Sequence, residues 1–562
     1  MSTTPTVETP REFNIATEYV DGPVTAGYGG RVAYVSGQDP VTYTDLQRRV
    51  NQVGNALASL GVEMEQRVGI LLPNSLEFVT AFFGAAKIGA VSAPISTAVT
   101  ANEQIFLLHE GCVRALVVSG PLCASFRARR AELPFLHHAL VVDGADLAPR
   151  EHDFATRVGG ASTALAAAPT SGDDVAFWLH TSGSTGTPKW AVHLHRNMPY
   201  AEQIYARPTI GLAPGDVVLS GGPYFHAYPL ALTTYFALRA GATVVLNRER
   251  STPLRMFQLI REHRATVFAA APTLYAQMLA AGTGPDCDLS SVRVCLSAAE
   301  PLPADLWRRW RERFGVEILD GIGTTEALHV FMSNRRDHVR PGSSGTPVPG
   351  YDVRLVDEDG AEVGPNVIGN LAIKGGSLFA GYWNRRDVTQ RVLRGEWYYT
   401  GDKYTRDADG YYWYTGRVDD MLRVSGHWVS AAAGSSSLPS CRRRRRARFS
   451  GSSSVTDRVR PRYRDARHPE CVDLGGSSPC DDRVSRGRTR TEARRAPVVS
   501  PADTVGASRR HARDVLASSR GPLSGGVGNI GFEATPCSSV TLLLRVIAGL
   551  TLPMPFGRIG AR

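Results

Sequence analysis

The sequence predicts an α/β fold followed by a long C-terminal segment of a different character. Three observations lead to this expectation. Helical and strand patterns alternate as far as residue 350, short strands between turn residues follow from Tyr351 to Tyr414, and periodic patterns stop after Ser430. A chain of 562 residues is also too long to fold around one core, so about two to four domains are expected.

The first half of the chain has the order of elements that builds a parallel sheet. Apolar residues from Leu46 to Leu60 recur at helical spacing, with Thr44 as the expected N-cap and Gly61 as the end of the helix. A strand at 68–72, a helix at 75–88 and a strand at 90–95 follow. Further strands are expected at 115–118, 139–142, 217–219, 243–246 and 267–270. Because strand–helix–strand units place their strands parallel, we expect a mostly parallel sheet with helices on both faces.

The pattern changes between Tyr351 and Tyr414. Short segments rich in Tyr, Val and Ile are separated by turns at 357–360 and 407–410, each of which contains Asp and Gly. This arrangement favours a small antiparallel β-subdomain. In residues 431–562, Ser, Arg, Gly and Pro dominate, and such a composition buries too little apolar surface to offset chain entropy. We therefore expect this tail to be disordered.

The positive charge of the chain is confined to the tail. The net charge is +10, yet residues 431–562 contain 24 Arg, no Lys and 10 acidic residues, a net charge of +14. Residues 1–430 therefore carry a net charge of −4. The basic character of the whole chain is thus no argument for nucleic-acid binding by the main body.

Other features of the composition exclude some classes of protein. Eight cysteines occur without a CxxC pair, which argues against a zinc site or a disulfide framework. The polar N-terminal residues lack the apolar segment of a signal peptide. The apolar run at 540–550 is short and contains Arg545, so no membrane span is expected. A cytoplasmic protein is the expectation.

One loop has the composition of a phosphate-binding site. A strand at 177–180 runs directly into Thr181–Lys189, which is rich in Gly, Ser and Thr, and a second strand at 191–194 follows. Such a loop offers hydroxyl groups and accessible backbone N–H groups to a polyphosphate, and Lys189 adds a mobile positive charge. The sequence is not the common P-loop, because GxxxxGK[ST] is absent. A flexible surface loop is the alternative interpretation of this segment alone.

Three further motifs decide between these interpretations. Asp320–Glu326, Tyr399–Asp402 and Gly416–Asp420 follow the loop in order, and together the four motifs closely resemble those of the acyl-adenylate-forming, or AMP-binding, superfamily. Within that superfamily, the run Phe225–Tyr228 and residues 13–120 are similar to the benzoate-CoA ligases. The resemblance covers about residues 10–430 and excludes the tail.

The resemblance implies a fold and a division into domains. Residues 1–12 would be a flexible N-terminus, and 13–416 the large adenylation domain. That domain would contain two doubly wound βαβ-type subdomains and the antiparallel β-subdomain. Residues 417–430 would hold the hinge, at Asp419, and the start of a C-terminal domain, and 431–562 would be an aberrant tail.

The resemblance also implies an activity and a set of site residues. The enzyme would use ATP and Mg²⁺ to convert an aromatic carboxylate into an acyl-AMP, and would then transfer the acyl group to CoA. The catalytic residues would be Lys189, Thr325, Glu326 and His226, with Glu326 as the Mg²⁺ ligand. ATP would be bound by Thr181, Ser182, Gly183, Ser184, Thr185, Gly186, Lys189, Ala299, Glu300, Pro301, Asp320, Gly321, Thr325, Asp402 and Arg417. The aryl pocket would be lined by Ala227, Tyr228, Ile322, Gly323, His329 and Ile373.

The sequence departs from the superfamily in two places. Trp190 replaces the small glycine that usually follows the loop lysine, and a bulky ring there is expected to alter the packing of the loop. In addition, the superfamily carries a catalytic lysine in its C-terminal domain, whereas no lysine follows Lys403 here. We interpret the abrupt loss of pattern near residue 431 as the mark of a frameshift, and we expect this chain to bind ATP and acid but to adenylate slowly.

Two other functions remain as alternatives. The first is an adenylating enzyme that loads a carrier protein instead of CoA, which the large domain barely distinguishes. The second is a non-catalytic binding protein whose basic tail contacts nucleic acid or an anionic surface. Its support is the run Arg442–Arg446, which has no interleaved aromatic residues for base stacking. Nucleic-acid binding is therefore not expected.

Overall fold

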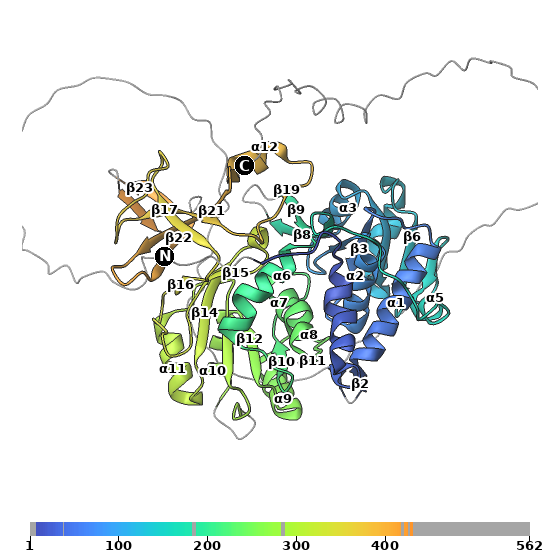
Figure 1. The fold of residues 1–562 in the computed structure, drawn as a ribbon, viewed down its shortest axis with the longest axis horizontal. Helices are drawn as coiled ribbons and strands as arrows, with labels where there is room; N and C mark the ends of the chain where they lie inside the picture. Colours follow the sequence, from blue (N-terminus) through green and yellow to red (C-terminus); the bar gives the residue numbers. More distant parts are fainter. Residues whose placement is uncertain are drawn as a thin grey trace, which may run out of the picture. The chain divides into compact units, whose positions relative to one another are not determined.

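The computed structural model describes residues 7–37, 39–182, 187–282 and 287–417, and the backbone of two strands between 421 and 430 (Figure 1). These residues belong to the first of two units into which the chain divides, Met1–Arg448. The predictions for Gly183, Ser184, Thr185, Gly186, Asp419 and residues 431–562 lie outside the described residues, as does the prediction for the Ser182 side chain.

The first sheet contains eight strands within the described part of the chain, in the order β19-β9-β8-β4-β3-β5-β6-β7. The strand pairs from β8 through β4 to β7 are parallel, whereas β9 is antiparallel to both β8 and β19. The expected parallel sheet is thereby confirmed. The strands are β3 (Arg67–Leu71), β4 (Val91–Pro94), β5 (Val113–Ser119), β6 (His138–Val142), β7 (Glu151–Asp153), β8 (Val175–Ser182), β9 (Pro188–Leu194) and β19 (Gly381–Tyr382).

The second sheet contains nine strands among the described residues, in the order β16-β15-β14-β13-β12-β10-β11-β1-β2. Its central strands, from β14 to β1, are parallel, and its edges are antiparallel. The strands are β1 (Val32–Ser36), β2 (Asp39–Thr42), β10 (Val217–Ser220), β11 (Thr243–Val245), β12 (Val267–Ala270), β13 (Val294–Ser297), β14 (Ile318–Gly323), β15 (Val330–Ser333) and β16 (Thr346–Pro347).

Helices cover the outer faces of the two sheets and fill the layer between them. The outer helices of the first sheet are α3 (Ala101–Glu110) and α4 (Cys123–Ala128), and those of the second sheet are α9 (Pro253–His263), α10 (Pro272–Ala280) and α11 (Ala304–Phe314). The helices that share the central apolar core are α1 (Tyr43–Ser59), α2 (Leu76–Lys87), α5 (Phe154–Gly159), α6 (Asn197–Ala201), η5 (Glu202–Ile210), α7 (Ala227–Ala231), η6 (Leu232–Phe236) and α8 (Ala237–Ala240).

The start of α1 corrects one detail of the sequence interpretation. The N-cap is Thr42 and not Thr44, because the Thr42 side chain accepts the hydrogen bond from the Asp45 backbone N–H. Thr42 has extended backbone angles, as an N-cap requires, since it is also the last residue of β2. The periodic apolar pattern therefore located the helix but not its first turn.

A third, wholly antiparallel sheet forms the predicted β-subdomain. Its strands are β17 (Asp352–Val356), β18 (Gly369–Lys374), β20 (Leu393–Arg394), β21 (Trp397–Arg406) and β22 (Tyr412–Arg417). Figure 1 shows β17, β21 and β22 together, apart from α1 and α2. Helix α12 (Arg386–Val392) joins β19 to β20, and the backbone of a further hairpin follows as β23 (Met421–Val424) and β24 (His427–Ser430).

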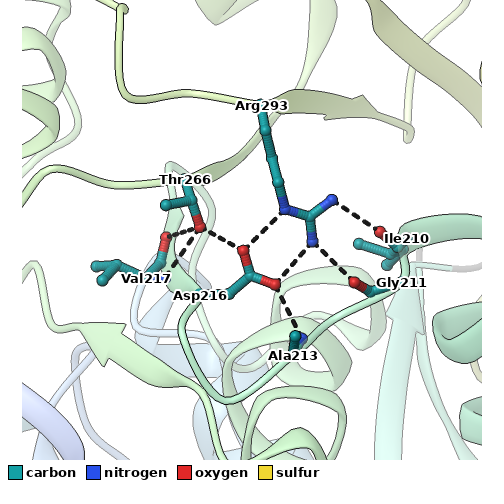
Figure 2. A network of polar contacts seen from close by, with 7 residues as sticks. All are labelled: Ile210, Gly211, Ala213, Asp216, Val217, Thr266 and Arg293. Atoms are coloured by element: carbon teal, nitrogen blue, oxygen red, sulfur yellow. Dashed lines mark hydrogen bonds and ion pairs between the residues drawn. The ribbon is translucent and has the colours of Figure 1, made fainter.

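A polar network fixes the amino ends of three parallel strands in the second sheet (Figure 2). Arg293, directly before β13, forms a two-point ion pair with Asp216, directly before β10, at 2.8 and 2.7 Å. Thr266, directly before β12, donates its hydroxyl to Asp216 at 2.6 Å. The same guanidinium donates to the carbonyl groups of Ile210 and Gly211 at the end of η5. The strand edge opposite the candidate site is thus closed by charge-assisted hydrogen bonds.

Candidate active site

A cleft of about 1040 Å³ opens at the carboxyl ends of β13 and β14, beside the β-subdomain. In open parallel sheets, this edge is where ligands usually bind. The cleft brings together the predicted Mg²⁺ ligand Glu326 and most of the residues predicted to bind ATP: Thr181, Lys189, Ala299, Glu300, Pro301, Asp320, Gly321, Thr325, Asp402 and Arg417. They come from segments that are far apart in the sequence, so the fold itself assembles the site.

Asp320 is the most deeply buried carboxyl group in the wall of this cleft. Only 5% of the residue is exposed, and its Oδ1 atom has no hydrogen-bond partner among the described residues. Burial raises the pKa of this carboxyl group to about 8. An unpaired buried acceptor is costly, and a ligand that brings an N–H group removes that cost. The position therefore fits the predicted contact with the adenine amino group.

The backbone around Asp320 explains why glycines surround it. A Cβ atom on Gly321 would lie 2.7 Å from the carbonyl oxygen of Met332, and one on Gly323 would lie 2.5 Å from that of His329. Strand β15 therefore packs against β14 more closely than any side chain would allow. The glycines of the motif thus serve strand packing, which keeps the wall of the cleft thin.

Glu326 and Lys189 face the same part of the cleft and share one neighbour. The Tyr382 hydroxyl donates a hydrogen bond to Glu326 Oε1 at 2.5 Å. The Lys189 ammonium lies 4.8 Å from the centroid of the Tyr382 ring. Burial raises the pKa of Tyr382, and the nearby Glu326 carboxylate raises it further, so the phenol stays a hydrogen-bond donor. Tyr382 was not among the predicted site residues.

Asp402 and Arg417 line the cleft from the β-subdomain, on the paired strands β21 and β22. Arg417 Nη1 lies 3.4 Å from Asp402 Oδ1. Burial raises the pKa of the Asp402 carboxyl group, and Arg417 opposes this shift. Gly401, between Thr400 and Asp402, has a φ of +81°, which favours glycine. The carboxylate is thus available to the hydroxyl groups of a ribose.

A second cavity, of about 320 Å³, adjoins the cleft. It is lined by four of the six residues predicted for the aryl pocket, Ala227, Tyr228, Gly323 and His329, and by the predicted catalytic residue His226. The rings of Tyr228 and His329 stack with centroids 5.4 Å apart, and the Tyr228 hydroxyl and both His329 ring nitrogens have no hydrogen-bond partner among the described residues. Burial lowers the pKa of His329 to about 3, so the ring is neutral. The cavity is a mostly apolar slot with a few polar atoms.

The two cavities have a common wall. Ala299, Gly323, Thr324 and Thr325 line both of them. The Thr325 carbonyl group accepts a hydrogen bond from His193 at 2.9 Å, and burial lowers the pKa of that histidine to about 4. A neutral, fully buried ring therefore fixes the backbone at the junction. A carboxylate in the smaller cavity and a triphosphate in the cleft would meet at Thr325.

Two predicted pocket residues lie elsewhere. Ile322 lines the large cleft and not the smaller cavity. Ile373 lines neither cavity, and its side chain is fully buried in the core beneath β18. The structure does not bring either residue to the pocket for which it was predicted.

Several residues of the smaller cavity were missed by sequence reasoning. Ser220 ends β10 and Gly222 lies just after it, and Ala270 ends β12 and Ala271 follows it. They carry no distinctive chemistry, so composition gives no signal for them. Their position at the carboxyl ends of predicted strands of a parallel sheet was the available signal. The same rule leads to Ala298, which follows β13.

Trp190 points away from the cleft. The residue is fully buried on the outer face of the first sheet, 6.0 Å from Trp178 between ring centroids, and its Nε1 donates to the Leu107 carbonyl at 3.3 Å. Because side chains alternate along a strand, Lys189 faces the cleft while Trp190 faces the core. The large ring at this position therefore packs in the core on the outer face of the sheet without reaching the cleft.

The cleft, the adjoining slot and the two sheets define an enzyme that joins a nucleotide to a second, smaller ligand. Residues 24–383 match the AMP-binding enzyme family, so the chain belongs to this family and is an AMP-forming acid–thiol ligase. It is 43% identical over 434 residues to a benzoate–CoA ligase of Thauera aromatica. The aligned residues cover 76% of this chain and 81% of that protein.

Two further comparisons agree with this classification. The chain is 40% identical to a 4-hydroxybenzoate–CoA/benzoate–CoA ligase of Rhodopseudomonas palustris, over 75% of this chain and 78% of the relative. It also resembles the crystal structure of the anthranilate CoA ligase AuaEII in complex with anthranoyl-AMP. That likeness has a TM-score of 0.73 and 36% identity, and covers 76% of this chain and 82% of the other. No helix in the described ranges is long and apolar enough to cross a membrane.

Proposed function

We propose that this chain activates a benzoate-type aromatic acid with ATP and transfers the acyl group to CoA. The main support for an aromatic substrate is the slot of about 320 Å³, which meets the nucleotide cleft at Thr325. Its stacked Tyr228 and His329 rings, and the alanines opposite them, suit a flat ring better than an alkyl chain. The relatives named for benzoate, hydroxybenzoate and anthranilate support this class of substrate.

The geometry supports a two-step reaction. In the first step, a carboxylate oxygen of the acid attacks the α-phosphorus of ATP, and pyrophosphate leaves. Lys189 contributes positive charge on the phosphate side, and Thr325 contacts the α-phosphate at the common wall. In the second step, the CoA thiol attacks the carbonyl carbon of the mixed anhydride, and AMP leaves. Charge that develops on the phosphoryl oxygens is stabilised best by groups fixed in advance.

Glu326 is the proposed ligand of Mg²⁺. Its carboxylate lies in the cleft, and the Tyr382 hydroxyl occupies Oε1. The other carboxylate oxygen suits a hard cation that prefers oxygen ligands and usually shares them with phosphates. Bound Mg²⁺ would neutralise charge on the triphosphate. No group of three or more His, Cys, Asp or Glu side chains forms a metal site of its own in the described ranges.

We further propose that adenylation by this chain is slow. The sequence contains four lysines, at 87, 189, 374 and 403, and none in the region where the family carries its second catalytic lysine. Losing one group aimed at developing charge lowers a rate by about 10²–10³-fold. A frameshift near codon 431 would explain the loss. Sequencing of the gene and the intact mass of the native protein test that origin, and an unbroken reading frame would exclude it.

The assay for the proposed function is acid-dependent exchange of pyrophosphate into ATP. Benzoate, 3- and 4-hydroxybenzoate and 2-aminobenzoate are compared with cyclohexanecarboxylate and acetate. We expect slow exchange with the aromatic acids and none with acetate. Ala227→Phe, which fills the slot, should abolish the response to acid and leave ATP binding intact. Equal exchange with acetate and benzoate would contradict an aryl pocket.

The acceptor of the acyl group requires a separate assay. CoA is the proposed acceptor because the named relatives are CoA ligases, and a phosphopantetheinyl carrier protein is the alternative. The enzyme is supplied with the aryl-AMP and with either CoA or the carrier protein, and the thioester that forms is measured. The acceptor that gives the thioester is the substrate. We also propose a cytoplasmic location, where ATP and CoA are available.

A further inference from the structure

Tyr382 reaches the active site because of the register between two strands. Strand β19 pairs with β9, and Tyr382 lies opposite Ala191. Lys189 is two residues before Ala191 and therefore on the same face of the sheet. Diagonal neighbours of this kind are within reach of aromatic and long side chains. Figure 1 shows β19 beside β9 at the edge of this sheet.

The segment that carries Tyr382 is anchored from its other face. The next residue, Trp383, donates its Nε1–H to the Glu110 carbonyl at 3.1 Å, and its ring lies 4.8 Å from that of Trp178. The Arg67 guanidinium lies 5.5 Å from both tryptophan rings. The Trp383 backbone N–H donates to the Trp190 carbonyl at 2.9 Å. Tyr382 is therefore held in place independently of any ligand.

Tyr382 contacts one positive and one negative group of the cleft at once. The face of its ring meets the Lys189 ammonium, and its hydroxyl donates to Glu326. In the described part of the chain, no ion pair joins Lys189 to Glu326. Both Glu326 and Tyr382 are buried, and opposite charges attract strongly in such a poorly solvated place. Tyr382 is the residue that lies against both charged groups.

We propose that Tyr382 is a positioning residue that separates Lys189 from Glu326. The ring offers the ammonium a cation–π contact, and the hydroxyl satisfies one carboxylate oxygen. Kept apart in this way, Lys189 is available to phosphate and the Glu326 carboxylate, which Tyr398 also contacts, is available to magnesium. That Lys189 binds phosphate and Glu326 binds magnesium rests on the proposed function. That Tyr382 keeps the two side chains apart does not depend on it.

Zero-length carbodiimide cross-linking tests the separation in the full-length chain. The reagent joins an amine to a carboxylate only when the two are in direct contact, and the chain contains four lysines, of which Lys87 and Lys403 are buried. Tyr382→Leu removes both ring and hydroxyl, and Tyr382→Phe removes the hydroxyl alone. The exposed pair Lys374–Glu396, with an N–O distance of 2.6 Å, is an internal control that should cross-link in every variant.

We expect a Lys189–Glu326 cross-link in Tyr382→Leu, identified by mass spectrometry of peptides, and none in the wild type or in Tyr382→Phe. Tyr411→Leu is the matched control, because Tyr411 holds the Arg340 guanidinium 4.8 Å from its ring centroid but lies outside the cleft. A cross-link in the wild type at the level of Tyr382→Leu would overturn the proposal. So would its absence from Tyr382→Leu when the control pair has reacted.

The second test measures equilibrium binding of ATP at a series of magnesium concentrations. It asks whether separating Lys189 from Glu326 keeps both available to magnesium–ATP. Tyr382→Leu should weaken magnesium-dependent ATP binding by about tenfold or more, since a direct ion pair must first be broken. Tyr382→Phe should weaken it by only a few fold, and Tyr411→Leu should not change it. An unchanged magnesium dependence in Tyr382→Leu would refute the role even if the cross-link forms. Because neither measurement uses an acid, failure of the aryl-ligase function would be recognised separately.

Discussion

At the scale of single residues, the cleft depends on a carboxyl group in an unfavourable place. Asp320 is buried with one oxygen unpaired, and burial raises its pKa to about 8. In the unfolded chain, an aspartate has an ordinary pKa near about 3.9. Between these two values, the folded protein holds a proton that the unfolded chain has released. The free energy of unfolding therefore falls as pH rises from about 4 to about 8.

Asp320→Asn should remove this dependence. We expect the variant to gain stability over the wild type by about 2–4 kcal/mol between pH 5 and pH 8, at about 1.4 kcal/mol for each pKa unit. Urea unfolding at a series of pH values measures the difference. Above pH 8, where the wild-type group is a carboxylate, the variant should also bind ATP more weakly, because an amide is a weaker acceptor for adenine. A stability difference that does not change with pH would contradict the buried titration.

Trp190 allows a second prediction at this scale, because it lies directly after the proposed phosphate ligand Lys189. Trp190→Gly should destabilise the protein by about 3–5 kcal/mol, as expected for removal of a fully buried tryptophan. Trp190→Phe should cost less. ATP affinity, measured where the variant remains folded, should change little, since the indole faces the core. A large loss of ATP affinity in Trp190→Phe would show that the ring shapes the loop.

At the scale of elements, the network around Asp216 ties the starts of three strands to the end of η5. Burial alone would raise the pKa of Asp216, but hydrogen bonds from Arg293, Thr266 and the Ala213 backbone outweigh it and lower the pKa. A carboxyl group with a lowered pKa contributes stability that is present above its unfolded pKa and is lost as pH falls through its folded pKa. The network therefore adds to the acid sensitivity of the second sheet.

Asp216→Ala should destabilise the protein by about 3–5 kcal/mol, because Arg293 would lose its partner in a half-buried place. Chemical unfolding at neutral pH measures the loss. The difference from the wild type should shrink as pH falls below about 4, because the unfolded chain is then protonated at Asp216 while the folded carboxylate keeps its charge down to its lowered pKa. Activity per folded molecule should stay unchanged, because these residues lie at the strand edge opposite the cleft. The matched surface variant Asp387→Ala, at an exposed ion pair, should cost little.

The sequence predicted the elements better than the contacts between them. Periodic apolar residues located α1 and β3 to β6, and the motifs around Asp320 and Asp402 identified the walls of the cleft. Tyr382 was missed because its position depends on the pairing of β19 with β9, which are almost 200 residues apart, and local patterns contain no such register. Ile373 was assigned to the pocket through the family resemblance, and neither the motifs nor a strand pattern shows which face of β18 the core covers.

At the scale of the whole molecule, the described nucleotide site ends well before the tail begins. Its lining residues run from Thr181 to Arg417. A chain shortened to residue 430 should therefore bind ATP with an affinity within about twofold of the full chain, measured by titration calorimetry. The association rate of ATP should also be similar at low and high salt in both chains. Such a result would argue against electrostatic attraction of ATP by the arginine-rich tail. A loss of affinity beyond about tenfold on shortening would assign the tail a role in binding.

The wall that the cleft and the slot have in common has a thermodynamic consequence. Two ligands that press on the same four residues from opposite sides do not bind independently. If an aryl acid raises the affinity for ATP, then ATP must raise the affinity for the acid by the same factor. Changes at Thr324 or Ala299 should then alter this coupling as well as either affinity. The selectivity of the enzyme for its acid is accordingly a property of the ternary complex, and affinities measured for either ligand alone do not determine it.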